Sequence, residues 1–163
     1  MSEKFALSIR PATEADAEAV VAIAIAEWEA IYQGYRAQLG DEIFFMSFPD
    51  HKAQKTKGVL ANLKSGTMYV TECEGEVAGF IHYVYDAASR MGTISNNAVS
   101  GKFRGRGIGP RQYEFVFDKL REHGAVGVRV TTGLDDAHAP ARRAYEKAGF
   151  SANTQSITYY KKL

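Results

Sequence analysis

The stretch that most constrains the fold is RGRGIG (104–109), which follows a strand-like run and opens a helix-like one. Glycine lacks a Cβ, so backbone N–H groups can turn toward one concavity and a ligand can approach closely. The helix that follows adds the positive end of its dipole and first-turn amides without helical partners. Pro110 fits there because a first-turn residue need not donate an N–H. We therefore favour a turn that binds phosphate or pyrophosphate over a turn with merely solvated arginines.

Two better-known phosphate loops fit this stretch less well. A Walker-type loop needs G-x-x-x-x-G-K-[ST], and no Lys-Ser/Thr pair follows here. A dinucleotide fingerprint, G-x-G-x-x-G, is half satisfied by Gly105 and Gly107, but Gly109 comes one residue early. That fingerprint also belongs to the first strand-to-helix turn, whereas this one comes about two thirds of the way along the chain.

The hydrophobic periodicity predicts a single mixed α/β domain over residues 1–163. Glu74-Gly75 joins two strand-like runs and indicates a hairpin, and Thr13 with Asp16 forms a capping-box pattern before a helix. Residues 30–40 continue that helix or form a loop. The strands are expected at 5–10, in the hairpin at 67–86, and at 92–100, 125–132 and 156–163. The helices are expected at about 14–29, 41–48, 51–66, 111–124 and 137–149.

Composition narrows the function and the compartment. Twenty basic residues against nineteen acidic ones leave a net charge of +1, which argues against nucleic acid or an anionic membrane as the main partner. No stretch approaches the roughly 20 apolar residues that span a bilayer. The first residues lack the apolar stretch of a signal peptide. The single cysteine, Cys73, is expected to be a small strand residue, and a cytoplasmic location follows.

Two motifs together resemble the GCN5-related N-acetyltransferase (GNAT) family. RGRGIG matches its (Q/R)-x-x-G-x-(G/A) loop, and HAPARRAYEKAGF (138–150) is similar to its N-x-x-A-x-x-x-Y-E-K-x-G-F segment. SIRPATEADAEAV also resembles the usual opening of the family. The resemblance covers nearly the whole chain. It implies an acyl-CoA N-acyltransferase fold, in which helices flank a mixed, mostly antiparallel central sheet, with acetyl-CoA as co-substrate and no metal. Family members are often dimers, so a homodimer is one assembly it allows.

The resemblance also assigns roles to residues. Ala98 and Val99 end the central strand where the family's strands splay apart, and the Val99 N–H would face the thioester carbonyl. Tyr145 matches the tyrosine that protonates or hydrogen-bonds the departing thiolate. His138 stands where the family usually has Asn, and is either a coenzyme contact or an exposed helix-start residue. The loop amides that hold the pyrophosphate belong to Arg104, Gly105, Arg106, Gly107, Ile108 and Gly109.

The expected general base is missing from this chain. Some family members carry a Glu six positions before the final valine of the strand, and that position here is Thr93. A lysine-like amine has a pKa of about 10.4, so making it neutral at pH 7 costs about 4 to 5 kcal/mol, against about 1 for an α-amino group. Either the acceptor has a low pKa, or water relays the proton, or a distant base takes it. Candidates for that base are Glu29, His82 and Asp86, each more easily explained as structural.

The acceptor site is expected near the first helix and the central strands. Trp28 and Tyr32 are i, i+4 neighbours beside Glu29, which suits a cationic amine, although an aromatic helix face packed on the sheet is the favoured explanation. Asn96 and Asn97 point to opposite faces of one strand, and we expect Asn97 to contact substrate.

Three alternative functions are compatible with these observations. The first is an acetyl-CoA-dependent N-acetyltransferase acting on the primary amine of a small-molecule or amino-acid-like acceptor, or alternatively on a peptide N-terminus. The second is a non-catalytic acyl-CoA-binding or sensor domain, suggested by the absent carboxylate and by His138. The third is a nucleotide-binding protein that uses the loop for ATP.

Overall fold

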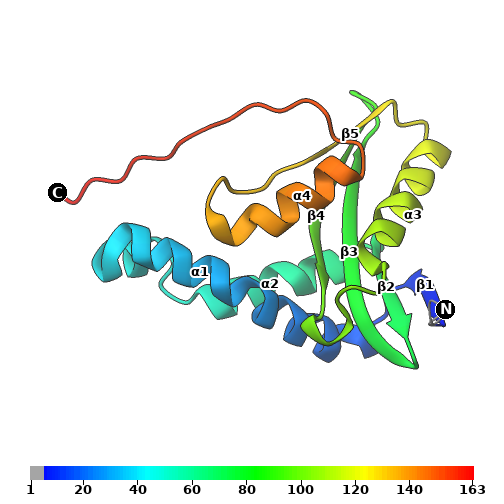
Figure 1. Ribbon diagram of the computed structural model, residues 1–163, viewed down its shortest axis with the longest axis horizontal. Helices are drawn as coiled ribbons and strands as arrows, with labels where there is room; N and C mark the ends of the chain where they lie inside the picture. The colour runs from blue at the N-terminus through cyan, green and yellow to red at the C-terminus, as the bar shows by residue number, and fades with distance from the viewer. Residues whose placement is uncertain (1–5) are drawn as a thin grey trace.

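The computed structural model describes residues 6–163, so the first residue of the strand expected at 5–10 lies outside the described residues. A five-stranded sheet in the order β1-β2-β3-β4-β5 forms the centre of the molecule (Figure 1). Neighbouring strands are antiparallel except β4 and β5, which are parallel, so the predicted mixed and mostly antiparallel sheet is confirmed. The strands are β1 Leu7–Pro11, β2 Met68–Cys73, β3 Glu76–Asp86, β4 Met91–Val99 and β5 Gly127–Val130.

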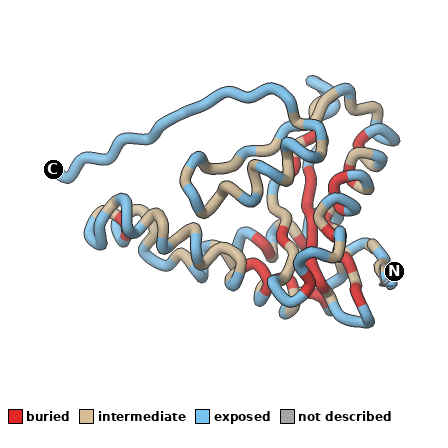
Figure 2. The backbone as a smooth tube through the Cα atoms, viewed as in Figure 1, coloured by how far each residue is buried: buried red, intermediate tan, exposed pale blue. Residues whose placement is uncertain are grey.

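Helices cover both faces of this sheet. One face packs against α1 (Ala17–Ser47) and α2 (His51–Lys64), and the other against α3 (Ile108–Glu122) and α4 (Ala139–Lys147). Buried residues are concentrated along the central strands and on the helix sides turned toward them (Figure 2). The 3₁₀ turns are η1 Glu14–Asp16, η2 Gly101–Phe103 and η3 Asp136–His138. Within residues 6–163, no helix is both long enough and apolar enough to cross a membrane.

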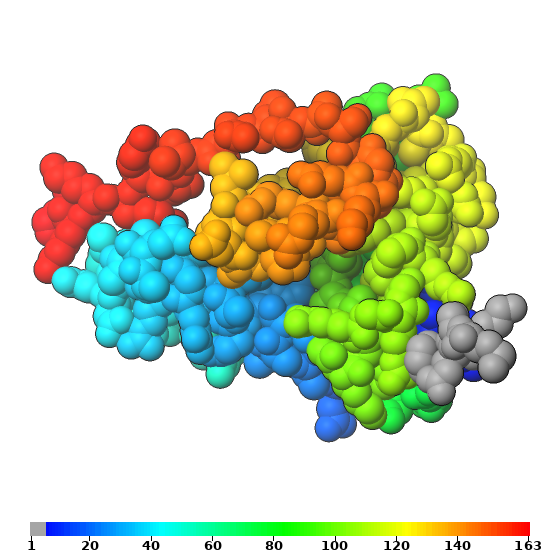
Figure 3. All heavy atoms as spheres, viewed as in Figure 1, coloured from blue at the N-terminus to red at the C-terminus, as the bar shows by residue number. Residues whose placement is uncertain are grey.

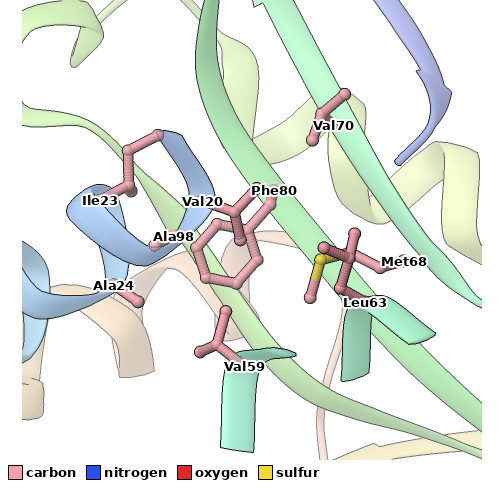
Figure 4. Close-up of a cluster of buried hydrophobic side chains, with 9 residues drawn as sticks. All are labelled: Val20, Ile23, Ala24, Val59, Leu63, Met68, Val70, Phe80 and Ala98. Carbon is pink, nitrogen blue, oxygen red and sulfur yellow. The ribbon is translucent and has the colours of Figure 1, made fainter. Parts of the chain in front are cut away.

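The first helix forms where the periodicity predicts it. Val20, Ile23 and Ala24 are buried against Phe80 of β3 (Figure 4). The Asp16 carboxylate accepts a hydrogen bond from the Thr13 N–H at 2.7 Å, so the capping box is confirmed, although it opens a 3₁₀ turn and α1 itself begins at Ala17. The helix then continues beyond residue 29, through residues 30–39, and is interrupted at Gly40, where φ is 73°.

The predicted hairpin between β2 and β3 is also confirmed. Glu74 and Gly75 both have positive φ, 55° and 82°, the combination that a two-residue turn of matching twist requires. Cys73 ends β2 and is fully buried, as expected of a small strand residue.

The two parallel strands separate partway along their length. Met91–Ile94 of β4 pairs with Gly127–Val130 of β5, and the pairing stops there. A register shift between His82 and Tyr83 marks the same point on the β3 side of β4. Within the described residues, Ser95–Val99 therefore has no partner strand on the β5 side, which leaves strand backbone available to a ligand.

The strand predicted at 156–163 is wrong. Residues 151–163 have no regular secondary structure and run past α4 toward the far end of α1 (Figures 1 and 3), where Lys162 Nζ lies 2.6 Å from Glu42 Oε1. Ile157 and Tyr159, which gave the segment its strand-like pattern, are 73% and 85% exposed. A strand-like pattern forms a strand only where a neighbour accepts its backbone hydrogen bonds, and the segment pairs with none of the five strands.

Candidate active site

The glycine-rich loop has the geometry of an anion site. Gly105 and Gly107 adopt the left-handed conformation, with φ of 78° and 75°, and α3 begins immediately afterwards at Ile108. A Cβ placed on Gly105, Gly107 or Gly109 would meet no atom within 4 Å, so the space above the loop is open. The loop therefore fits a pyrophosphate held by backbone amides at a helix N-terminus.

The cations around the loop are paired with glutamates in this structure. Arg106 Nη1 lies 2.9 Å from Glu74 Oε2, Lys102 Nζ lies 2.6 Å from Glu76 Oε2, and Arg104 pairs with Glu27. Exposed pairs of this kind contribute little to stability. The side-chain cations are therefore shared with carboxylates, so that the field at a bound anion would come mainly from the backbone amides and the helix dipole.

Glu27 of α1 lies next to the beginning of the loop. Its Oε1 accepts a hydrogen bond from the Gly101 N–H at 2.9 Å, and its other oxygen pairs with Arg104. The side chain is only 14% exposed. Glu27 thus connects α1 to the beginning of the loop, a role that no sequence signal indicates.

Tyr145 reaches the central strand at Asn97. Its hydroxyl donates to Asn97 Oδ1 at 3.2 Å, and Asn97 Nδ2 donates to the Tyr113 hydroxyl at 2.9 Å. The Tyr113 and Tyr145 ring centroids are 5.7 Å apart. Burial, with the neighbouring Tyr113 adding to it, raises the pKa of Tyr145 well above the usual phenol value. Tyr145 therefore keeps its proton near neutral pH and acts as a hydrogen-bond donor.

Ala98 and Val99 lie in the part of β4 that β5 does not cover. The Ala98 side chain is buried in the core between the sheet and α1, and Val99 pairs with Gly79 of β3. The Tyr145 hydroxyl meets the strand at Asn97, two residues before Val99. The structure thus brings together the uncovered strand segment, which precedes the loop in the chain, and the predicted tyrosine, which follows the loop.

His138 is engaged by its own turn. Its Nδ1 lies 2.7 Å from Asp135 Oδ2, and its ring lies 6.1 Å from that of Tyr35. Burial tends to raise the pKa of Asp135, but hydrogen bonds from the His138 ring and backbone outweigh it and lower the pKa. The side chain is 12% exposed, so it is not an exposed helix-start residue. Contact between His138 and the coenzyme stays a prediction.

The four predicted acceptor residues do not form one pocket. Glu29 and Tyr32 line a cleft of about 520 Å³ between α1 and α2, with His51 at one wall. Trp28 packs against the core beside α2. Asn97 faces α3 and α4, on the other side of the sheet. Three of these residues lie on α1 and one on β4, and the different sides of the helix and the opposite face of the strand separate their side chains.

A second polar group lies on the opposite face of β4. Lys55 Nζ donates to Asn96 Oδ1 at 2.7 Å, and Asn96 Nδ2 donates to Asn62 Oδ1 at 2.6 Å. The same Nζ lies 3.2 Å from the centre of the Trp28 ring. Asn96 and Asn97 thus face opposite sides of the sheet, as expected. Sequence analysis missed Lys55 as the partner of Asn96, because the sequence around Lys55 shows only the pattern of a polar helix face.

The three distant base candidates lie apart from the Asn97 cluster. Glu29 accepts a hydrogen bond from Gln33 at 3.0 Å, and Asp86 accepts one from the Ala88 N–H at 3.0 Å in the turn before β4. His82 is buried and its Nε2 lies 3.0 Å from Ser65 Oγ, while its Nδ1 has no partner in the structure. Burial lowers the pKa of His82, so it is neutral near pH 7. The structure gives Glu29 and Asp86 structural partners.

Comparison with known proteins agrees with this geometry. The model of the acetyltransferase (GNAT) family matches residues 28–150, and the chain belongs to that family, whose co-substrate is acetyl-CoA. Mycothiol acetyltransferase of Corynebacterium glutamicum is 31% identical over 86 residues, 53% of this chain and 28% of that protein. Streptothricin acetyltransferase of Streptomyces lavendulae is 34% identical over 89 residues, 53% of this chain and 45% of that protein. The chain thus spans less than half the length of these relatives.

A solved structure shows the same fold. The PaiA N-acetyltransferase of Thermoplasma acidophilum, crystallised with coenzyme A, superposes with a TM-score of 0.71 at 15% identity, covering 93% of each chain. The central sheet and its flanking helices are therefore those of the acyl-CoA N-acyltransferase fold.

Proposed function

We propose that this chain is an acetyl-CoA-dependent N-acetyltransferase that acetylates the primary amine of a small, polar acceptor. The observation that carries the proposal is the Tyr145 hydroxyl, which reaches Asn97 in the segment of β4 that β5 leaves uncovered. A family loop supports coenzyme binding alone, whereas a partly buried hydroxyl at the uncovered strand supports chemistry. Relatives named for mycothiol and streptothricin support a small-molecule acceptor.

The binding part of the proposal rests on backbone groups. The amides of residues 104–109 would hold the pyrophosphate, and the uncovered edge of Ser95–Val99 would hold the pantetheine arm. A backbone N–H at that edge would stabilise the charge that develops on the thioester oxygen when the amine attacks. Because these amides are fixed by the sheet and by α3, they need no rearrangement during the reaction.

Tyr145 has a restricted role in this scheme. A thiol has a pKa of about 8.5 and a free phenol about 10, and burial raises the pKa of Tyr145 further. Complete transfer of its proton to the thiolate is therefore unfavourable, and the hydroxyl stabilises the leaving sulfur as a hydrogen-bond donor. In the structure the hydroxyl donates its one proton to Asn97 Oδ1, and it would redirect this hydrogen bond from Asn97 to the leaving sulfur.

The direct test is an acetylation assay with thiol release as the readout. The full chain is incubated with acetyl-CoA and a panel of small amines, amino acids and peptides. We expect turnover with at least one small amine and thermal stabilisation by coenzyme A. Stabilisation without any turnover would instead support an acyl-CoA sensor, activity confined to peptides would indicate an N-terminal acetylase, and stabilisation by ATP but not coenzyme A would indicate a nucleotide-binding protein.

Cellular location and assembly complete the proposal. The cytoplasm supplies acetyl-CoA and keeps thiols reduced, in agreement with the buried, unpaired Cys73. A homodimer is the assembly we expect. Sedimentation or light scattering at assay concentration tests it directly, and a monomer that turns over substrate would contradict it.

A further inference from the structure

The cluster around Lys55 is built and not incidental. Three elements converge on the lysine: Trp28 from α1, Asn62 from its own helix α2, and Asn96 from β4. The hydrogen bond from Asn96 Nδ2 to Asn62 fixes the orientation of the Asn96 amide, so that its oxygen points at Nζ. Trp28 packs against the hydrophobic core of this face, which holds the indole in place. The amine of Lys55 is therefore positioned by rigid neighbours.

No carboxylate balances the charge of this lysine. Among residues 6–163, Lys55 forms no ion pair. The charged or titratable groups on the surrounding elements are otherwise engaged. Glu29 on α1 accepts a hydrogen bond from Gln33 and lies 3.5 Å from Lys52 on α2. The ring of His51 on α2 lies 4.6 Å from the ring of Tyr32, centroid to centroid. His82 on β3 forms a hydrogen bond with Ser65.

The surroundings of Lys55 therefore disfavour the charged, protonated form of its side chain. The indole face and the Asn96 oxygen favour the charged form, but burial disfavours it more strongly and lowers the pKa of Lys55 to about 8. A group with that pKa is neutral in about one molecule in ten at pH 7 and about half at pH 8. A base poised near the working pH is the kind that proton transfer requires.

Lys55 also lies beside the uncovered strand. Its hydrogen-bond partner Asn96 directly precedes Asn97, the residue that Tyr145 contacts. Successive residues of a strand are about 3.3 Å apart and point to opposite faces. Tyr145 and Lys55 thus address neighbouring residues of one strand from its two sides, with the uncovered edge between them.

We propose that Lys55 is the catalytic base that accepts the proton of the acceptor amine, and that Trp28 and Asn96 form the subsite that receives this amine. The inference rests on the proposed function. The neutral Lys55 Nζ accepts a proton from the acceptor nitrogen as the new C–N bond forms and the C–S bond breaks. The electron pair of the C–S bond leaves on sulfur, which is protonated by solvent, and Lys55 later returns its proton to solvent. The step needs no further reactant.

The test compares Lys55→Met and Lys55→Arg with Lys57→Met, an exposed lysine on the same helix that serves as the matched control. Arginine keeps a cation over Trp28 but remains protonated at all accessible pH values. We expect both Lys55 variants to lower kcat/KM for an alkylamine on the order of 100-fold, the lower end of the range of general base catalysis. In both Lys55 variants, the affinity for coenzyme A and the melting temperature should stay near the wild-type values. Lys57→Met should match the wild type in kcat/KM, coenzyme A affinity and melting temperature.

The pH profile separates this role from a structural one. For an amine whose pKa lies above the range measured, the growing neutral fraction of the amine itself makes kcat/KM rise steadily with pH. In the wild type we expect an additional change of slope near pH 8, where Lys55 titrates, and both Lys55 variants should keep the steady rise but lose this change of slope. The loss of activity should shrink for an amine of low pKa, which needs less help. Full activity in Lys55→Arg, or a change of slope near pH 8 that persists in Lys55→Met, would overturn the inference while leaving the proposed function intact. Absence of turnover in the wild type overturns both.

Discussion

Asn96 and Asn97 are neighbours of the same residue type, yet the two faces of β4 give them opposite surroundings. Asn97 lies between the buried Tyr113 of α3 and the half-buried Tyr145 of α4, and Asn96 lies between a half-buried lysine and Asn62 of α2. Burial disfavours charge on both faces. On one face it makes Tyr145 hold its proton more tightly, and on the other it lowers the pKa of Lys55 to about 8, so that the lysine loses its proton more readily.

The comparison shows how a single physical effect can produce a donor and an acceptor. A phenol is neutral when protonated and an amine is neutral when deprotonated, so the same desolvation moves their pKa values in opposite directions. Pairs of groups driven apart in this way are typical of acid and base assignments in active sites. Because successive side chains of β4 point to opposite faces, two neighbouring asparagines are enough to contact Lys55 on one face and Tyr145 on the other.

The largest expected effect is on the tyrosine face. Tyr145→Phe removes the donor for the leaving sulfur, and we expect kcat to fall about 100-fold with little change in coenzyme binding. Tyr113→Phe is the matched control, because it removes a hydroxyl from the same cluster that accepts from Asn97 rather than donating to the leaving sulfur. Steady-state kinetics with acetyl-CoA measure both. Equal losses in the two variants would show that the cluster acts only by supporting the fold.

Displacing the strand itself should impair both faces together. A Cβ on Gly79 would lie 2.6 Å from the Ala98 carbonyl oxygen and 3.2 Å from the Val99 Cα, so Gly79→Ala must push β3 away from β4. We expect the free energy of unfolding to fall by about 2 kcal/mol, with loss of coenzyme binding. Gly58→Ala in α2 is the control: its Cβ would meet nothing within 4 Å, and it should raise stability slightly. Chemical denaturation measures both.

A change that only destabilises the fold must be distinguished from a change that impairs catalysis at one face of β4. Asp16 accepts two hydrogen bonds of 2.8 Å from Arg10, which lower its pKa from 3.8 to about 2 despite burial. Since the folded pKa lies below the unfolded one, this stabilisation is present above about pH 4 and is lost as the pH falls through about 2. We expect Asp16→Asn to lower stability by about 2 kcal/mol at neutral pH.

Unfolding curves measured between pH 7 and pH 2 check this prediction, because the gap between wild type and Asp16→Asn should close as the pH falls. At 25 °C, the variant should keep the wild-type pH profile of turnover. A shifted profile would mean that Asp16 acts on the site and not only on the fold.

The smallest expected effects separate the two asparagines. Asn97→Ala leaves both tyrosine hydroxyls without this partner, and we expect about a tenfold lower kcat with a nearly constant KM for the acceptor, of the order of one hydrogen bond. Asn96→Ala releases Lys55, and we expect mainly a several-fold higher KM for the acceptor. The same kinetic change in both variants would remove the distinction between the two faces.

Much of the fold follows from local rules. The capping box at Thr13, the hairpin turn at Glu74-Gly75 and the glycines that begin α3 each depend on the conformations of a few adjacent residues. The segment at 156–163 shows where such rules fail, since its alternation was genuine but no strand accepts its hydrogen bonds. The predicted acceptor residues line different surfaces for a related reason, because the elements alone do not fix which side chains share a cavity.

The sequence by itself determined the order of elements up to α4, the glycine-rich loop and the candidate tyrosine, because each is encoded by residue type and short spacing. Only the tertiary structure decided that Tyr145 ends at Asn97, that β5 leaves Ser95–Val99 uncovered, and that Lys55 lies against Trp28 and Asn96. The two hydrogen bonds among these contacts, Lys55 to Asn96 and Tyr145 to Asn97, each join residues at least 41 positions apart in the chain. Burial and register, which set the proton affinities of the site, arise only when distant segments pack together.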